Sequence, residues 1–214
     1  MSESRVSAIV LAGGRSSRFG RDKLAEPLAG RTLLDHAIAA VRPLARETIV
    51  VGRPGATPRV PDGTIMVHDP SAFEGPLIGL LTGLRGATQP VALVVGGDMP
   101  TLVPSVLEAL IARLDDPTID AVVLEDDGRD RPLPSAVRTA LAMSAAERLV
   151  AAGERRLGAL FEALATAVID EPTWRMFDPD GRTLCDIDAP ADLLQASKPS
   201  PINRSTGRRS SGKN

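Results

Sequence analysis

The chain has 214 residues, 43% of them hydrophobic and 24% charged, with a formal net charge of -2, and this length and composition are typical of one globular domain. Aromatic residues make up only 2%, so the chain offers neither a strongly basic surface for nucleic acid nor the rings on which single-stranded bases stack. No apolar stretch approaches the roughly 20 residues that cross a bilayer. Residues 1–5 lack the apolar run of a secretory signal, and the lone Cys185 cannot form an internal disulfide. We therefore expect a cytoplasmic protein that binds neither membranes nor nucleic acid.

Short apolar runs rich in Val and Ile alternate with segments of helical period, which predicts a mostly parallel sheet flanked by helices. Apolar side chains recur on one face of residues 33–41 and again on one face of residues 106–114, as expected for helices that pack on a sheet. The expected strands are Val6–Leu11, Thr48–Val51, Ile65–His68, Val91–Val95, Ala121–Leu124, Pro134–Val137 and Ala167–Ile169. The predicted fold class is α/β, a single-domain three-layer sandwich.

Helix ends are indicated at three places. Thr32 with Asp35, and Ser144 with Glu147, have the spacing of a capping box, in which two side chains satisfy backbone N–H groups at a helix start. Gly153 falls where a helix beginning at Ser144 would need a left-handed residue to end.

The C-terminal residues differ in composition from the rest of the chain. Residues 198–214 are rich in Ser, Gly and Arg and almost free of apolar side chains, so they cannot repay the entropy of ordering. We expect one folded domain over residues 1–197 and a flexible polar tail over residues 198–214.

Residues 11–23, directly after the first strand, combine glycines with cationic side chains. Gly13 and Gly14 allow close approach of the backbone to a ligand and let successive N–H groups form an anion-binding nest. Positive charge is added by Arg15, Arg18, Arg21 and Lys23. The spacing matches neither a Walker loop nor Gly-x-Gly-x-x-Gly. The pattern predicts a polyphosphate site, and the alternative is a strand-to-helix turn whose arginines face solvent.

A second motif, Gly96-Gly97-Asp98, ends the fourth expected strand. Ligands of open α/β sheets bind outside the carboxyl ends of the strands, so residues 11–14 and 96–98 are expected at one edge. A carboxylate there suits Mg²⁺, which proteins usually hold with one or two carboxylates while substrate phosphates and water complete its shell. The alternative is that Asp98 caps the next helix.

A third motif places Asp186 and Asp188 two residues apart. If the segment is extended, both carboxylates point the same way, where they can share a metal or order its waters. The alternative for Asp188 is the N-cap of a final helix that contains Leu193, and for Asp186 we favour a structural role.

Three further segments carry weaker signals. The glycines of residues 74–79 suit close approach to a base or ribose, but a Gly-Pro turn that opens a helix explains them as well. The charged residues 128–132 and 152–156 are candidates for contact with an anionic acceptor, and the alternative is a solvated surface.

Through these motifs the sequence resembles the molybdenum cofactor guanylyltransferase (MobA-like) family of nucleotidyltransferases, over about residues 6–195. The motifs follow in the family's order: residues 11–23 (LAGGRSSRFGRDK), Gly75–Gly79, Gly97–Pro100, Ala152–Arg156 and Asp186–Pro190. The resemblance implies a Rossmann-like sheet of the nucleotide-diphospho-sugar transferase type.

The resemblance also implies roles for individual residues. Asp69 would contact the nucleoside and Asp98 would hold Mg²⁺, with Asp188 as a second candidate metal ligand. The catalytic candidates are Arg18, Lys23 and Asp98. The nucleotide-binding candidates are Leu11, Ala12, Gly13, Gly14, Lys23, Asp69 and Asp98.

The activity implied is transfer of GMP from GTP to the phosphate of molybdopterin, with release of pyrophosphate. This chain has Gly52, and acidic residues at 186 and 188, where several guanylyltransferases of the family have Asn, so a cytidylyltransferase that uses CTP, for molybdopterin or another phosphorylated small molecule, stays open. From another class, a non-catalytic nucleotide-binding protein in cofactor delivery would keep the triphosphate pocket and lack the acceptor site.

Overall fold

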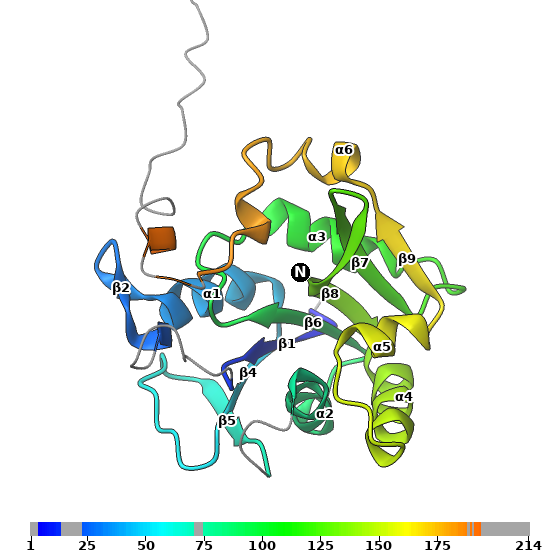
Figure 1. Ribbon diagram of the computed structural model, residues 1–214, viewed down its shortest axis with the longest axis horizontal. Helices are drawn as coiled ribbons and strands as arrows, with labels where there is room; N and C mark the ends of the chain where they lie inside the picture. Colours follow the sequence, from blue (N-terminus) through cyan, green and yellow to red (C-terminus); the bar gives the residue numbers. More distant parts are fainter. Residues whose placement is uncertain (1–3, 14–22, 71–74, 188, 190, 194–214) are drawn as a thin grey trace, which may run out of the picture.

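The computed structural model describes residues 4–13, 23–70, 75–187, 189 and 191–193. Its centre is a seven-stranded sheet with the order β5-β4-β1-β6-β8-β7-β9 (Figure 1). These strands are β1 (Val6–Leu11), β4 (Glu47–Gly52), β5 (Thr64–His68), β6 (Val91–Gly96), β7 (Ala121–Asp126), β8 (Arg129–Arg138) and β9 (Thr166–Ile169). Only β8 runs antiparallel to its neighbours β6 and β7, so the predicted mostly parallel sheet is confirmed.

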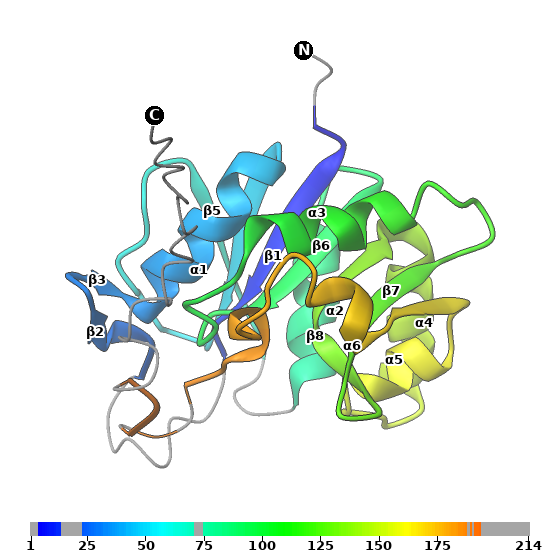
Figure 2. The same cartoon turned by 90° about the horizontal axis from the view of Figure 1, so that it is seen from above.

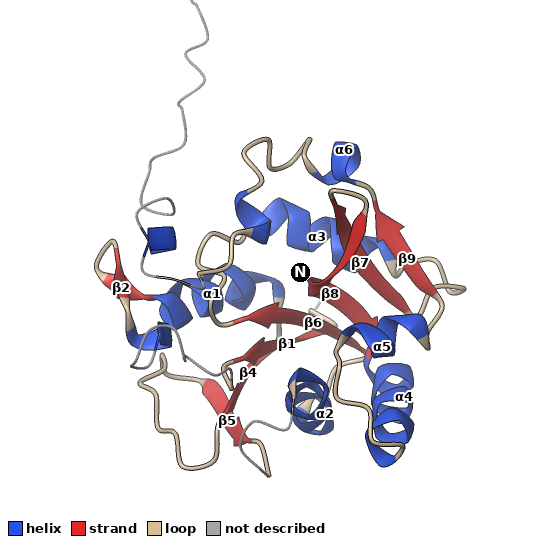
Figure 3. Ribbon diagram, in the orientation of Figure 1, coloured by secondary structure: helices blue, strands red, loops and turns tan. Residues whose placement is uncertain are grey.

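Helices cover both faces of the sheet (Figure 3). The helices are α1 (Leu33–Val41), α2 (Pro76–Gly86), α3 (Pro104–Arg113), α4 (Thr139–Ala151), α5 (Gly158–Glu162) and α6 (Glu171–Trp174). The 3-10 turns are η1 (Lys23–Ala25), η2 (Arg42–Leu44) and η3 (Arg182–Leu184). Most apolar residues of α1 and α3 belong to one core cluster, and most of those of α2, α4 and α5 belong to another, which confirms the three-layer sandwich.

The alternation of side chains along each strand explains why one sheet supports two cores. In β1, Ala8 and Val10 pack into the cluster with α1 and α3, whereas Ile9 between them packs under α2. All three are fully buried, as expected of a central strand that is covered on both faces.

All seven predicted strands are present, and the main difference is at β8. It begins at Arg129 rather than Pro134, because a tight turn at Asp127 and Gly128 joins it directly to β7 as a hairpin. The sequence prediction missed a short hairpin of β2 (Pro27–Leu28) and β3 (Arg31–Thr32), whose two-residue strands are too short for a periodic signal.

The helix caps were predicted with mixed success. The box at Thr32 is confirmed, since its side chain accepts from the N–H of Asp35 at 3.0 Å. The start at Ser144 is wrong, because α4 begins at Thr139, directly after β8, and leaves Ser144 on an exposed helical face. Gly153 does end α4, with a φ of 89°.

None of the helices in the described part of the chain is long and apolar enough to span a membrane. The predicted tail over residues 198–214 lies outside the described residues.

Candidate functional site

The carboxyl ends of β1, β4 and β6 form one edge of the sheet, because these strands are parallel and in register. Backbone hydrogen bonds continue beyond the strands: Ala12 donates to the Val51 carbonyl at 2.8 Å, and Gly97 donates to the Leu11 carbonyl at 2.9 Å. The segments that follow β1 and β6 are thereby held side by side. This confirms that residues 11–13 and 96–98 share one edge.

Lys23 crosses this edge and meets Asp98. The Lys23 Nζ donates to Asp98 Oδ2 at 2.6 Å and to the Ile187 carbonyl at 3.1 Å, and the Ile187 N–H donates to the Asp98 carbonyl at 3.0 Å. Lys23 is only 9% exposed, and a buried ammonium is stable only with acceptors around it. Three segments far apart in the sequence are thus joined around one positive charge.

The Asp98 carboxylate does not cap the following helix. The N-cap of α3 is Val103, and no side chain caps the backbone N–H groups there. The capping alternative is therefore wrong. The Asp98 side chain keeps 27% of its surface exposed, so it is accessible from the edge while paired with Lys23.

Asp69 is brought to the same edge from β5. Its N–H donates to the Gly52 carbonyl at 3.0 Å, and its carboxylate lies between Gly13 and the first turn of α2. A Cβ added at Gly13 would lie 3.2 Å from Asp69 Oδ2, and one added at Gly79 would lie 3.5 Å from it. The absence of a Cβ at Gly13 therefore permits the close approach of the Asp69 carboxylate, whereas a Cβ at Gly79 would make an ordinary van der Waals contact with it.

A family model described as the MobA-like NTP transferase domain matches residues 8–168, the stretch that contains Gly13, Lys23, Asp69 and Asp98. The chain belongs to this family. It is therefore a nucleotidyltransferase.

Relatives in the family match most of the chain. A protein of Chloroflexus aggregans described as a "probable molybdenum cofactor guanylyltransferase" is 36% identical, over 88% of this chain and 91% of its own length. One of Mycobacterium avium with the same description is 34% identical, over 88% of this chain and 93% of its own length.

Solved structures share the fold. Molybdopterin-guanine dinucleotide biosynthesis protein A from Archaeoglobus fulgidus superposes with a TM-score of 0.74 at 24% identity, over 89% of this chain and 96% of that one. A 2-C-methyl-D-erythritol 4-phosphate cytidylyltransferase from Thermus thermophilus gives a TM-score of 0.66 at 20% identity, over 88% and 96%.

Two of the weaker sequence signals meet at the start of α2. Gly75, the N-cap, has a φ of 110°, and a Cβ there would lie 2.8 Å from the Arg155 carbonyl oxygen. The same carbonyl accepts from the Leu77 N–H at 3.3 Å. The expected Gly-Pro opening of a helix is thus present, and it is packed against the segment 152–156 of this MobA-like transferase.

The arginines of that segment have different surroundings. Arg155 donates through Nη1 to the carbonyls of Val150 and Glu154, at the end of α4, so its guanidinium stabilises the chain reversal. Arg156 is exposed and pairs with Glu154 at 2.9 Å. Backbone N–H groups of Arg156 and Arg155, with the Arg156 side chain, lower the pKa of Glu154 from 4.5 to about 2.

Gly14, Arg18 and Asp188 lie outside the described residues. Asp186 is exposed and the neighbouring Ile187 is buried. The sequence prediction missed Ile187. The available signal was an apolar residue between two aspartates, because such a residue is often buried and then fixes its segment in place.

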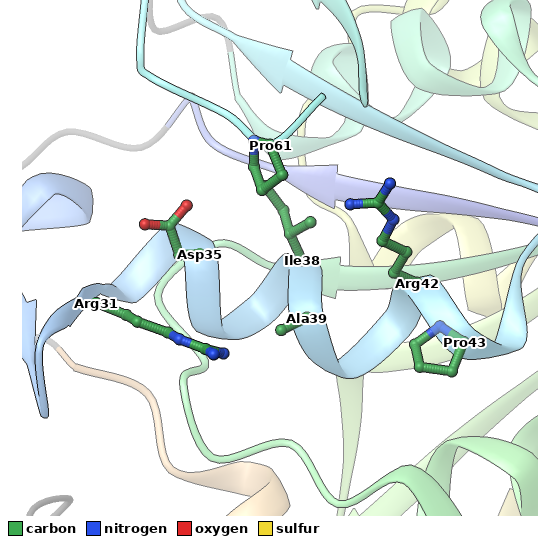
Figure 4. A pocket seen from close by; sticks show the side chains of 7 residues that line it. All are labelled: Arg31, Asp35, Ile38, Ala39, Arg42, Pro43 and Pro61. Atoms are coloured by element: carbon green, nitrogen blue, oxygen red, sulfur yellow. The ribbon is translucent and has the colours of Figure 1, made fainter. Parts of the chain in front are cut away.

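A separate groove of about 440 Å³ lies along the outer side of α1 (Figure 4). Arg31, Asp35 and Arg42 line it, with Pro61 facing them. None of the candidate site residues in the described part of the chain lines this groove, so the groove is separate from the candidate site.

Proposed function

We propose that this nucleotidyltransferase acts in molybdenum cofactor biosynthesis and transfers GMP from GTP to the phosphate of molybdopterin, with release of pyrophosphate. The observation that carries the proposal is the Lys23–Asp98 pair, with 2.6 Å between Nζ and Oδ2, at the carboxyl edge and beside the Gly13 segment. The relatives at 34–36% identity are described as probable molybdenum cofactor guanylyltransferases, which supports a guanylyl donor and a molybdenum cofactor acceptor.

The reaction is a displacement at the α-phosphorus of the triphosphate. An oxygen of the acceptor phosphate forms the new P–O bond, the bond between the α-phosphorus and the bridging oxygen breaks, and pyrophosphate leaves with that electron pair. The attacking phosphate is already anionic at neutral pH, so no side chain has to remove a proton. Catalysis then consists of positioning and of stabilising negative charge.

We assign this work to the cations and backbone of the edge. Lys23 supplies a fixed positive charge in a largely buried position, where electrostatic stabilisation is stronger than in water. Arg18, in the same motif, is proposed as a second cation, and the N–H groups of Leu11–Gly14 as donors to the nucleotide phosphates. Asp69, which lies against Gly13, is proposed to contact the nucleoside.

The residues present also suit Mg²⁺. Asp98 offers a hard carboxylate oxygen at the edge, and a single carboxylate with substrate phosphates and water is a usual Mg²⁺ environment. Asp188 is proposed as a further ligand. When bound, Mg²⁺ would supply positive charge that the triphosphate needs in order to lie near a second anion.

The test is pyrophosphate release by the purified protein with Mg²⁺ and intact molybdopterin, with GTP, CTP, ATP and UTP offered separately. Release with GTP alone is the expected result. Release with CTP alone would replace the proposal by the cytidylyltransferase alternative. Triphosphate binding without release of pyrophosphate would favour the non-catalytic nucleotide-binding protein.

Variants connect the activity to the proposed residues. We expect Lys23→Met and Asp98→Asn each to lower turnover by about 10²–10³-fold, the usual loss when one transition-state contact is removed. Asp62→Asn is the matched control, since Asp62 is an exposed carboxylate in the loop between β4 and β5. Near-normal turnover in both site variants would contradict the assignment.

A further inference from the structure

The segment Cys185–Ile187, here called the C-terminal strap, touches the site through one residue. The peptide groups of Ile187 contact both members of the ion pair: its N–H donates to the Asp98 carbonyl at 3.0 Å, and its own carbonyl accepts from Lys23 Nζ at 3.1 Å. The backbone of Ile187 is thus bonded to the main chain of Asp98 and to the side chain of Lys23.

The side chain of Ile187 is anchored away from the two main cores. It is fully buried in a small cluster with Leu28 of β2 and Leu33, the first residue of α1. Cys185 and Leu193 pack against this cluster. In Figure 2 the orange part of the chain after η3 runs toward β2 and β3, in agreement with these contacts. A fully buried isoleucine fixes its backbone, because shifting it would open a cavity.

The chain just before the strap is fixed as well. Thr101 Oγ1 donates to the Arg182 carbonyl at 2.7 Å, and the Val103 N–H donates to Thr183 Oγ1 at 3.2 Å. The Thr183 N–H in turn donates to Asp178 Oδ2 at 2.6 Å. The first two bonds tie η3 to the loop that follows Asp98, so polar contacts hold the chain just before the strap, and the apolar cluster holds the end of the strap.

We propose that Ile187 is a positioning residue for the nucleotide site: burial of its side chain locks the strap, and the locked peptide holds Lys23 beside Asp98 in the arrangement that receives a metal-bound triphosphate. The proposal rests on the proposed function for the role of Lys23 and Asp98. Shortening the side chain leaves both charged residues in place and releases the backbone that sets their separation.

Lys23 provides a direct readout, because the sequence has no other lysine before Lys198. The rate at which an amine-reactive reagent modifies Lys23 is measured by mass spectrometry of peptides, with Lys198 and Lys213 as internal references. In Ile187→Ala we expect Lys23, which is 9% exposed in the wild type, to be modified severalfold faster relative to the references. Ile187→Val keeps a β-branched side chain and should restore a rate close to that of the wild type.

The matched control is Ile119→Ala. Ile119 is also an isoleucine outside a strand, 7% exposed, and it precedes β7 at the opposite edge of the sheet. Ile119→Ala removes the same atoms as Ile187→Ala from a buried position, but it leaves the strap unchanged. Variants are compared at equal folded fraction, established by urea unfolding. Equal Lys23 modification in Ile187→Ala and Ile119→Ala, or no increase in either, would overturn the proposal.

Binding of Mg²⁺–GTP, measured by calorimetry, tests the consequence for the ligand. We expect Ile187→Ala to weaken binding by about 10–100-fold, the range found when an outer-shell partner of a metal ligand is removed, with Ile119→Ala close to the wild type. Unchanged binding in Ile187→Ala would overturn the positioning role. If the wild type binds no triphosphate, the proposed function fails, and the Lys23 modification rates still decide whether the strap holds this side chain.

Discussion

Lys23 is 9% exposed, and its charge is balanced by groups that the fold brings to it. The exposed pair Arg85–Glu147, with side chains 59% and 48% exposed, is worth about 0–1 kcal/mol. Losing a partner of a fully buried pair costs about 3–5 kcal/mol. Because the Asp98 side chain keeps 27% exposure, the Lys23–Asp98 pair lies between these limits and remains accessible from solvent.

Glu154 leads to a prediction about pH. Its pKa in the folded protein is lowered from 4.5 to about 2, first by the N–H of Arg156, then by the N–H of Arg155 and the Arg156 side chain. A depressed carboxyl pKa stabilises the folded state above the unfolded pKa, and the contribution disappears as the pH falls through the folded value. The stability that Glu154 adds is thus present above about pH 4.5 and is lost between about pH 4.5 and pH 2.

We therefore expect Glu154→Gln to be less stable than the wild type at pH 6, and the difference to shrink as the pH is lowered to 2. The measurement is urea unfolding of both proteins at several pH values. A difference in free energy of unfolding that stays constant from pH 6 to pH 3 would show that the Glu154 charge is not what stabilises this turn.

Among the elements, α2 packs closely on the sheet at Gly83. A Cβ added at Gly83 would lie 2.6 Å from Ile9 Cγ2 and 3.0 Å from Val51 Cγ2. The absence of a side chain at Gly83 thus sets how near the helix comes to β1 and β4. The start of the same helix carries Gly79, which faces the Asp69 carboxylate, so the depth of α2 also affects the site.

The two glycines near the end of α2 form a matched pair for a test. We expect Gly83→Ala to destabilise the protein by about 1–3 kcal/mol, because neither Ile9 nor Val51 has room to move. At Gly86 a Cβ would lie 3.7 Å from its nearest neighbours, Ile49 and Val67, so Gly86→Ala should be neutral or stabilising by up to about 1 kcal/mol. Urea unfolding of both variants distinguishes them, and equal effects would contradict the close packing.

The end of α4 shows how a local signal positions a distant contact. The N–H groups of Gly153 and Glu154 donate to the carbonyls of Val150 and Leu149 at 3.0 and 2.9 Å, the paired bonds that close a helix with a left-handed residue. The reversal directs the Arg155 carbonyl onto the first turn of α2. The cap at Gly153, which the sequence predicted, therefore positions a contact at the start of α2, beside the candidate site.

At the scale of the whole molecule, the candidate site is assembled from segments that share only the carboxyl edge of the sheet. Gly13 follows β1, Asp69 follows β5 and Asp98 follows β6, while Lys23 lies in η1 and Ile187 in the strap. The loops that follow parallel strands lie on one side of the sheet. The strap, near the C-terminal end of the chain, contacts Lys23 and Asp98 there through Ile187.

Trp174 reports whether the C-terminal segment unfolds with the sheet. It is the only Trp in a chain without Tyr, it is fully buried in the core cluster that includes β1 and α1, and its Nε1–H donates to the Glu125 carbonyl at 2.8 Å. We expect its fluorescence and the far-UV circular dichroism to change over the same range of urea, as for one cooperative domain. A fluorescence change at clearly lower urea would mean that residues after β9 unfold separately.

The elements were predictable because their signals are local. The apolar runs of β1 and β6, the face of α1, the capping box at Thr32 and the left-handed Gly153 each depend on a few neighbouring residues. The box at Ser144 failed for the same reason, since its spacing also occurs inside a helix, and only the end of β8 decides where α4 begins.

The sequence by itself determined the α/β class, the sheet edge that holds residues 11–13 and 96–98, and the motifs that identify the family. Only the tertiary structure decided that Asp98 pairs with Lys23 rather than capping α3, that Asp69 lies against Gly13, and that Ile187 is anchored behind them. These contacts join residues from 56 to 164 positions apart. Such long-range contacts form only when the whole chain has folded around the sheet. A local pattern of side chains therefore cannot predict them.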